Sequence, residues 1–429
     1  MALYLSENPP GPEGSNGNLN LRCFWRAGSR ELKGKLHRTP SPNQERSVLS
    51  INMFKIIQDP IWGPIEVKPE FLQIIDTEEF QRLHWIGQLG LCHMVFPGAT
   101  QTRFQHSLGT MHIAEKMGEK LSSKRIGELK AAALLHDIGH FPFSHSFENF
   151  FMEKYGISHE SVSMDIIRGK AGSGQIKDIL EKNSIEPEVV VSILAKSGEF
   201  PLEESIVSGP IDSDEIDYLA RDSYYTGVNL LPFDFRRIVS VLMTDGERIY
   251  IEQKGIPAIE SLLISRFLMY KSVYFHKTVR IIQKMVSRAV DLESPGKSTS
   301  SMKDLQFLDM LKHGKGGDII RRVERRELVK LTAQHEIKKE SDEKSFRKEM
   351  NDRFPEAYID VVPPFSFKND DRVKNRIDVM AHGKYLDIRT ISPLLHSLYD
   401  SFNMRKIFVY GESERKNEIE NFTSKFFSS

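Results

Sequence analysis

From about residue 53 onward, apolar residues recur every three or four positions, which is the spacing of amphipathic helices. Residues 126–138 are apolar nearly all round, so this segment is predicted to be a buried central helix that ends at Gly139 and Pro142. Because this helical spacing covers most of the chain and only short stretches have the character of strands, the fold is predicted to be mainly α-helical. The other helices are predicted after Asp76-Thr77, after His106 and over 158–168, 187–196, 213–221, 257–291, 393–403 and 414–426, and the strands within 56–67 and over 357–362, 385–388 and 406–410.

Two changes in composition divide the chain into three predicted parts. Residues 1–44 hold ten Gly or Pro residues and few apolar anchors, which predicts a disordered leader over residues 1–52. A helical core follows over residues 53–295. Of the 42 residues from 312 to 353, 22 are charged, which favours a solvated helix or a mobile segment. Together with the short strands beyond it, this stretch predicts a charged linker and a small C-terminal α+β appendage over residues 296–429.

Composition excludes several classes of protein. No apolar run approaches the roughly 18 residues that a membrane span needs, and no charged-then-apolar secretory leader is present, so we expect a soluble, cytoplasmic protein. Only two cysteines occur, Cys23 and Cys92, which excludes a disulfide framework and a cysteine-based zinc cluster. The 59 basic residues balance 59 acidic ones, so binding of nucleic acid would need a local basic patch.

The histidines are concentrated in one stretch. Six of the 14 histidines fall within the 54 residues from 106 to 159. His136 and Asp137 end the predicted buried helix, where an ionisable pair costs several kcal/mol unless it is paired or bound to a metal. With His140 and His145 close behind, three imidazoles and a carboxylate lie within ten residues, and these groups are ligands of first-row divalent metals. The stretch therefore predicts a polar pocket with a metal, for which Asp214 is a candidate further ligand.

Short blocks around these residues resemble a known family. Arg103-Phe-Gln-His106-Ser, then His136-Asp137, then Asp214 resemble the H…HD…D signature of HD-domain metal-dependent phosphohydrolases. The resemblance runs from about residue 53 to the end of the chain, and it implies an HD-domain helical core and a metal-dependent hydrolase. Blocks similar to the deoxynucleoside triphosphate triphosphohydrolase branch of that family lie at 81–90, 95–99, 103–109, 135–145, 158–160 and 216–222.

The resemblance also implies roles for individual residues. The metal ligands would be His106, His136, Asp137 and Asp214, and this mixture of nitrogen and oxygen atoms suits Mn, Fe, Mg or Zn without choosing among them. The catalytic residues would be His145 with Glu148 and His159 with Glu160, because a carboxylate can orient an imidazole for proton transfer. The residues that would bind substrate are Arg103, His140 and Arg266 at the phosphates, Gln88, Leu89, Tyr218 and Asp222 at the sugar, and Tyr274 near the base.

For a member of this branch, the implied reaction is hydrolysis of a deoxynucleoside triphosphate, with dGTP as one candidate, to a deoxynucleoside and inorganic triphosphate. The branch usually forms homo-oligomers, so a dimer or a tetramer is expected. Two positions depart from the family, since Glu215 stands where a phosphate-binding lysine is expected and Phe275 where a base-contacting glutamine is. Two alternatives stay open: an HD phosphohydrolase acting on another nucleotide phosphoester, and a nucleotide- or nucleic-acid-binding module.

Overall fold

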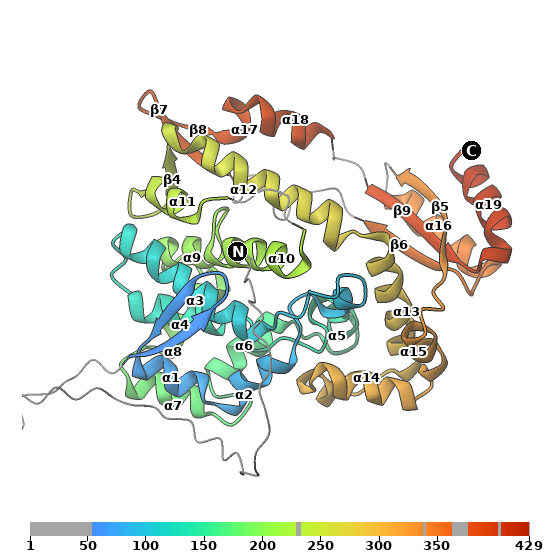
Figure 1. Ribbon diagram of the computed structural model, residues 1–429, viewed down its shortest axis with the longest axis horizontal. Coiled ribbons are helices and arrows are strands. Elements are labelled where there is room, and N and C mark those ends of the chain that lie inside the picture. The colour runs from blue at the N-terminus through green and yellow to red at the C-terminus, as the bar shows by residue number, and fades with distance from the viewer. Residues whose placement is uncertain (1–53, 229–232, 338–339, 363–375, 402–404, 429) are drawn as a thin grey trace, which may run out of the picture. The chain divides into compact units, whose positions relative to one another are not determined.

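The computed structural model describes residues 54–228, 233–337, 340–362, 376–401 and 405–428 (Figure 1). The predicted leader over residues 1–52 lies outside them. The described chain is mainly helical, as predicted, with three small sheets. None of the helices in this part of the chain combines the length and the apolar character that crossing a membrane requires. The cytoplasmic location stays a prediction.

The helices and strands have the following bounds. The helices before residue 230 are α1 (Pro69–Ile75), α2 (Glu78–Gln81), α3 (Arg103–Lys120), α4 (Ile126–Leu135), α5 (Glu148–Tyr155), α6 (His159–Ile167), α7 (Gln175–Lys182), α8 (Pro187–Ala195), α9 (Pro201–Ser208) and α10 (Ser213–Thr226). Those after it are α11 (Phe235–Val241), α12 (Ile256–Met269), α13 (Lys277–Glu293), α14 (Asp304–His313), α15 (Gly317–Glu324), α16 (Glu340–Arg353), α17 (Ile388–Ile391), α18 (Pro393–Ser401) and α19 (Lys416–Ser428). The strands are β1 (Lys55–Asp59), β2 (Gly63–Val67), β3 (Leu242–Thr244), β4 (Ile249–Glu252), β5 (Lys330–Ile337), β6 (Tyr358–Val362), β7 (Asp378–Ala381), β8 (Lys384–Asp387) and β9 (Arg405–Gly411).

Helices α3 and α4 pack against each other and form the centre of the helical core (Figure 1). α3 begins after Thr102, whose backbone N–H donates to the side chain of Gln105, one half of a capping box. α4 is buried from Leu129 to Leu135, so the prediction of a buried central helix is confirmed. α10 packs on α3, and α8 packs on α4. The ends of these helices meet where the predicted ligands lie.

The helix predicted after Thr77 is shorter than its apolar pattern indicates. Thr77 caps α2 through its hydroxyl oxygen, and one turn of 3-10 helix follows α2. Ile86 then adopts an extended conformation (φ −116°, ψ 111°), and its carbonyl accepts a hydrogen bond from the backbone N–H of Arg103 (2.9 Å). Contact with the start of α3 therefore overrides the helical pattern, and it brings residues 87–89 to the site.

The helix predicted over 257–291 is also interrupted. α12 passes into a π-helical turn over Tyr270–Tyr274, where the N–H of Phe275 donates to the carbonyl of Tyr270 (2.8 Å). α13 begins only at Lys277. Turns of this kind are frequent at functional sites, and here the turn carries Tyr274 to the cavity described below.

The C-terminal part contains more regular structure than its charge pattern predicts. The stretch over 312–353 includes α15, β5 and α16, and is neither one solvated helix nor a wholly mobile segment. β9 is the central strand of the sheet β5-β9-β6, on which α19 packs. In the sheet β3-β4-β7-β8, β7 pairs in parallel with β4. Strands on both sides of the predicted boundary at residues 295 and 296 thus belong to one sheet.

Candidate active site and metal centre

The four predicted metal ligands converge from three helices. His106 lies in the first turn of α3, His136 and Asp137 directly follow α4, and Asp214 lies in the first turn of α10. The Nε2 atom of His106 is 3.1 Å from Oδ1 of Asp214 and 3.6 Å from Oδ2 of Asp137. The Nε2 atom of His136 is 3.3 Å from Oδ2 of Asp137 and 3.9 Å from Oδ1 of Asp214. Two imidazole nitrogens and two carboxylates therefore surround one point.

The hydrogen bonds of the two histidines leave the atoms that face this point available. The Nδ1 atom of His106 contacts Oδ2 of Asp217 (2.7 Å), and Nδ1 of His136 contacts the carbonyl of Ala133 (2.8 Å). Because a carboxylate and a carbonyl only accept, each Nδ1 is the donor and each Nε2 is the ring nitrogen that faces this point. Both Nε2 atoms are buried and lack a hydrogen-bond partner within the described residues. The donor set fits a divalent metal ion.

The charge on the two carboxylates also suits a cation. Burial opposes ionisation of Asp137, but the neighbouring Arg103 guanidinium (2.5 Å) outweighs it and holds the pKa of that carboxyl well below its usual range. Burial likewise opposes ionisation of Asp214, and the His106 ring, 3.1 Å away, outweighs it and lowers the pKa. Both groups are therefore ionised near neutral pH, and an ionised carboxylate can serve as a metal ligand.

A buried network that the sequence did not reveal stands behind His106. Asp217 accepts hydrogen bonds from Nε and Nη2 of Arg221 (2.9 and 2.8 Å) and from Nε1 of Trp62 (2.6 Å). Arg221 is fully buried and also donates to Asp59 (2.9 Å) at the end of β1. The hairpin β1-β2 thereby holds the carboxylate that orients His106. The spacing of Asp217 and Arg221, four residues apart on one helix, was the available sequence signal.

The predicted catalytic histidines share one carboxylate. The Nδ1 atom of His145 lies 3.0 Å from Oε2 of Glu148, and Nδ1 of His159 hydrogen-bonds to Oε1 of the same side chain. Burial opposes ionisation of Glu148, but the hydrogen bonds from both histidines lower its pKa. Glu160 is 3.5 Å from His159, with 60% of its side chain exposed. The structure therefore pairs His159 with Glu148 more closely than with Glu160.

His140 lies between the metal ligands and the histidine pair. Its ring stacks on that of His159 with 4.0 Å between centroids, and its Nε2 atom lies 3.4 Å from Oδ1 of Asp137. Burial and the nearby Arg103 guanidinium hold the pKa of His140 well below its usual range. The imidazole is therefore neutral near pH 7. It can take part in hydrogen bonding, but it contributes no positive charge toward a phosphate.

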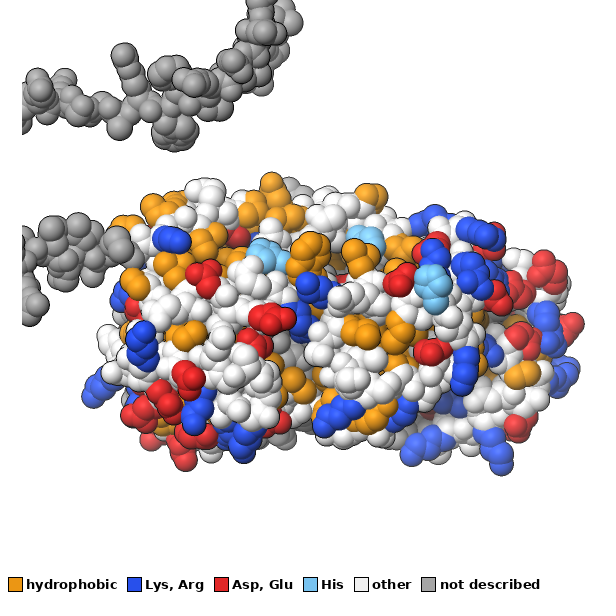
Figure 2. Space-filling view, turned by 90° about the horizontal axis from the view of Figure 1, so that it is seen from below, with side chains coloured by type: hydrophobic (Ala, Val, Ile, Leu, Met, Phe, Trp, Pro, Cys, Tyr) orange, Lys and Arg blue, Asp and Glu red, His pale blue; other side chains and the backbone are white. Residues whose placement is uncertain are grey.

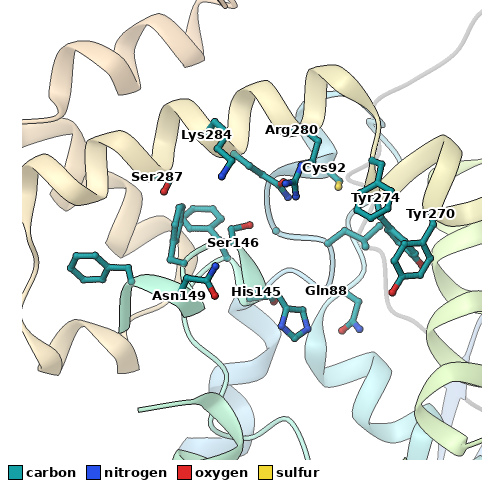
Figure 3. Close-up of a pocket in the computed structure, with 18 of the residues that line it drawn as sticks. Gln88, Cys92, His145, Ser146, Asn149, Tyr270, Tyr274, Arg280, Lys284 and Ser287 are labelled. Carbon is teal, nitrogen blue, oxygen red and sulfur yellow. The ribbon is translucent and has the colours of Figure 1, made fainter. Parts of the chain in front are cut away.

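Two cavities meet at this cluster. One, of about 400 Å³, is lined by the metal-ligand candidates His136, Asp137 and Asp214 and by His159 and Glu160. The other, of about 680 Å³, opens between α5, α10 and α13 (Figure 3). In the close-up, Gln88 and His145 lie across the cavity from Arg280, Lys284 and Ser287 of α13. The residues that line both cavities are Gln88, Arg103, His145 and Tyr218.

The larger cavity contains the predicted sugar and base residues. Leu89, Asp222 and Tyr274 line it, and Tyr218 and Tyr274 pack edge to face with 6.4 Å between ring centroids. Asp222 accepts hydrogen bonds from Nε2 of Gln101 and from the hydroxyl of Tyr274, each at 2.8 Å. Burial raises the pKa of Asp222 to about 6, although both hydrogen bonds act to lower it. This carboxyl therefore changes its charge close to physiological pH.

Arg266 is not placed where the sequence analysis expected it. Its guanidinium forms an ion pair with Glu215 (3.2 Å), and both side chains are buried. It lies over the ring of Tyr270 and does not line either of the two cavities. The reason is the departure at position 215, because a buried carboxylate needs a compensating cation. The expectation that Arg266 faces the phosphates is therefore not met in this structure.

On the face of the molecule shown in Figure 2, positively and negatively charged side chains are not separated into different regions. Figure 2 shows basic and acidic side chains interspersed over that face, with hydrophobic side chains between them. Such a mixture offers nucleic acid no extended basic patch there. The site itself is therefore the stronger guide to function.

Comparison with known families gives two adjacent matches. The HD domain profile matches residues 103–222, which include all four predicted ligands, and the profile of the HD associated region matches residues 233–428. These two regions together span most of the described chain.

Individual relatives agree with these matches. An uncharacterized protein of Methanocaldococcus jannaschii is 40% identical over 285 residues, which cover 64% of this chain and 59% of the relative. The human deoxynucleoside triphosphate triphosphohydrolase SAMHD1 is 30% identical over 384 residues, which cover 73% of this chain and 61% of that protein. The chain thus spans less than two thirds of the length of these curated relatives. A solved structure of a hypothetical protein from Aquifex aeolicus matches with a TM-score of 0.72 and 30% identity, over 85% of this chain and 98% of that one.

Proposed function

Because the chain belongs to the HD-domain metal-dependent phosphohydrolases, we propose that it hydrolyses deoxynucleoside triphosphates, with dGTP as one candidate, to a deoxynucleoside and inorganic triphosphate. The observation that carries this proposal is the junction of two cavities at Gln88, Arg103, His145 and Tyr218. A nucleoside can occupy the larger one while its 5′-phosphate reaches the cluster of histidines and carboxylates. The volumes of both cavities fall in the range of ordinary ligand sites.

His106, His136, Asp137 and Asp214 would hold a divalent metal ion, for which Mn, Fe, Mg and Zn are the candidates. When bound, the ion supplies Lewis acidity toward a phosphoryl oxygen and toward water. The chain's own contribution is to make Nδ1 of each histidine the hydrogen-bond donor, so that Nε2 faces the site, and to keep both carboxylates ionised, through the contacts of Asp217, Ala133 and Arg103.

Proton transfer is assigned to the histidines that share Glu148. Hydrolysis at the α-phosphorus breaks the bond to the 5′ oxygen, and the leaving alkoxide needs a proton. His145 is the donor that we assign to that oxygen, because it lines both cavities and Glu148 orients its ring. His159, on the other oxygen of Glu148, completes a relay that can restore the proton. Glu160, at 3.5 Å from His159, would only assist Glu148 in orienting that ring.

Substrate binding follows from the side chains at the junction. Arg103, held by Asp137 and by the hydroxyl of Ser144 (2.9 Å), presents a fixed guanidinium beside the α-phosphate. Gln88 and Asp222 would hydrogen-bond the 3′-hydroxyl, and Tyr218 would exclude a 2′-hydroxyl. Leu89 and Tyr274 would pack against the sugar and the base. His140 would complete the wall near the phosphate as a neutral hydrogen-bonding group.

A product analysis tests this proposal. The protein is incubated with each deoxynucleoside triphosphate, and with GTP, in Mn²⁺ or Mg²⁺, and the products are separated by ion-exchange chromatography. An Asp137→Ala variant is the blank. Inorganic triphosphate and deoxynucleoside, absent from the blank, are the expected products. Release of pyrophosphate or single phosphates would contradict the proposed bond cleavage.

The second candidate function is hydrolysis of another nucleotide phosphoester. The ion pair of Glu215 with Arg266 favours it, because this pair removes one cation from the set that would face a triphosphate. A nucleoside monophosphate needs fewer cations, and it would be cleaved to nucleoside and single phosphate. The product analysis separates the two candidates, since only the first yields intact triphosphate.

Assembly and location are further parts of the proposal. We propose a homo-oligomer, a dimer or a tetramer, that acts in the cytoplasm, and the similarity to a deoxynucleoside triphosphate triphosphohydrolase supports a nucleotide substrate. Light scattering after size-exclusion chromatography gives the mass in solution. A particle with the mass of one 429-residue chain, with and without nucleotide, would contradict the oligomer.

A further inference from the structure

The smaller cavity contains few cations that are free to meet a phosphate tail. Its charged lining consists of four carboxylates, from Asp137, Glu160, Asp212 and Asp214, and two cations, Arg103 and Lys196. Arg103 already pairs with Asp137 at 2.5 Å and donates to Ser144.

Arg266, the other cation expected here, is paired with Glu215. A polyphosphate in this cavity would therefore meet one cation without a carboxylate partner, which is Lys196.

The position of Lys196 in the fold is unusual for a lysine. It follows the last residue of α8 and adopts a left-handed conformation, with φ 54° and ψ 50°. This conformation is unfavourable for an L-residue, and glycine adopts it freely. The side chain is exposed, and within the described part of the chain its ammonium forms no ion pair.

We propose that Lys196 binds the distal phosphates of the substrate and so takes the place of the phosphate-binding lysine that Glu215 replaces. This inference rests on the proposed function, because it concerns the phosphates beyond the one that is attacked. With the nucleoside in the larger cavity, those phosphates extend past the metal ligands toward His159 and the end of α8, where Lys196 lines the wall. A mobile ammonium can follow a flexible polyphosphate as a point charge.

Binding of inorganic triphosphate alone tests the inference, measured by isothermal titration calorimetry on the full chain in Mg²⁺. Lys196→Gly removes the side chain and suits the left-handed backbone, so the variant is expected to fold and to keep the melting temperature. Its dissociation constant for triphosphate should rise about tenfold, which corresponds to the loss of one charge-assisted hydrogen bond. Lys196→Arg should stay within about threefold of the parent.

The matched control is Lys182→Ala, which changes an exposed lysine at the end of α7 that does not line the cavity. This control should bind triphosphate as the parent does. Equal affinity of the parent and the Lys196→Gly variant, or no binding of triphosphate by the parent, would overturn the inference.

Kinetics separate a failure of this inference from a failure of the proposed function. With dGTP, Lys196→Gly should raise KM by about tenfold and change kcat less, because the contact forms before the chemical step. If the parent protein hydrolyses dGTP and Lys196→Gly does so with the same KM, the inference is wrong and the proposed function stands. If the parent hydrolyses no deoxynucleoside triphosphate, the proposed function is wrong, and triphosphate binding still decides the role of Lys196.

Discussion

The Nδ1 atom of His106 lies 2.7 Å from Oδ2 of Asp217, and this contact connects the metal-ligand candidates to the hairpin β1-β2. Asp217 is fully buried and is held by Arg221 and Trp62, so the carboxylate has a fixed position. It fixes the proton of His106 on Nδ1 and points Nε2 at Asp137 and Asp214.

Asp217→Asn should weaken metal binding by about 10- to 100-fold, because the amide no longer orients and polarises the His106 ring as a carboxylate does. The measurement is a titration of the metal-free protein with Mn²⁺ by calorimetry, which needs no substrate. Asp178→Asn, at an exposed aspartate of α7, is the control and should bind Mn²⁺ as the parent does. Unchanged affinity in Asp217→Asn would show that the contact does not orient the ligand.

Gly109→Ala should destabilise the fold by about 1 to 3 kcal/mol, because the added Cβ atom would lie 1.8 Å from Oδ1 of Asp217 and 2.6 Å from Nη2 of Arg221. Both side chains are buried and cannot move away without losing hydrogen bonds. Urea denaturation gives the free energy of unfolding. Gly127→Ala in α4 is the control, since its nearest contact would be 3.6 Å, to Ile185, and it should not destabilise. Equal stability of the two variants would contradict the close packing.

Glu148→Gln should lower kcat by about 10²- to 10⁴-fold, because it removes the charge that orients both His145 and His159. KM should change little, since neither histidine is assigned to ground-state binding. Glu160→Gln is the matched comparison, and its effect should be much smaller because Glu160 is mostly exposed. A larger effect from Glu160 than from Glu148 would restore the pairing of His159 with Glu160 that the sequence predicted.

Asp222→Asn should stabilise the protein at neutral pH. Burial raises the pKa of Asp222 to about 6 from its usual value of 3.8, so the folded state holds this proton more tightly than the unfolded state does. Below about pH 4 the carboxyl is protonated in both states, so it does not lower the free energy of unfolding. Its destabilising effect grows as the pH rises to about 6 and is constant above that. The neutral amide avoids a cost of about 2 to 3 kcal/mol at pH 7.

The measurement is the free energy of unfolding of both proteins between pH 4 and pH 7.5. The stability difference should vanish toward pH 4 and reach its maximum above pH 6. A difference that does not depend on pH would show that Asp222 titrates normally. The same variant should raise KM for a deoxynucleotide, if Asp222 binds the 3′-hydroxyl.

The resemblance to the family names four metal-ligand candidates far apart in the sequence, and the structure brings these four side chains together. His136 and Asp137 stand at the end of an all-apolar helix, and His106 and Asp214 each stand at the start of another. The contacts that support them could not be predicted, since Trp62 and Asp217 are 155 positions apart and only the folded chain brings them together. The resemblance to the family also implied Glu160 as the partner of His159, whereas the structure supplies Glu148 from 11 positions upstream.

The interruptions of the predicted helices could not be predicted from the apolar spacing either. Ile86 has the spacing of a helical residue, but its carbonyl pairs with the N–H of Arg103, and this tertiary contact outweighs the helical pattern. The turn at Tyr270–Tyr274 likewise leaves no trace in the apolar spacing. Both interruptions lie at the larger cavity. Apolar periodicity therefore predicted the helices of the core better than the segments that line the larger cavity.

Isotope labelling tests the central claim most directly. Hydrolysis of dGTP in water enriched in ¹⁸O, in the presence of Mn²⁺, should place one labelled oxygen in the released inorganic triphosphate and none in deoxyguanosine, as seen by mass spectrometry. That result locates the attack at the α-phosphorus, the atom that we propose lies beside the four metal-ligand candidates. Label in deoxyguanosine, or label only in pyrophosphate or single phosphate, would contradict the proposed reaction.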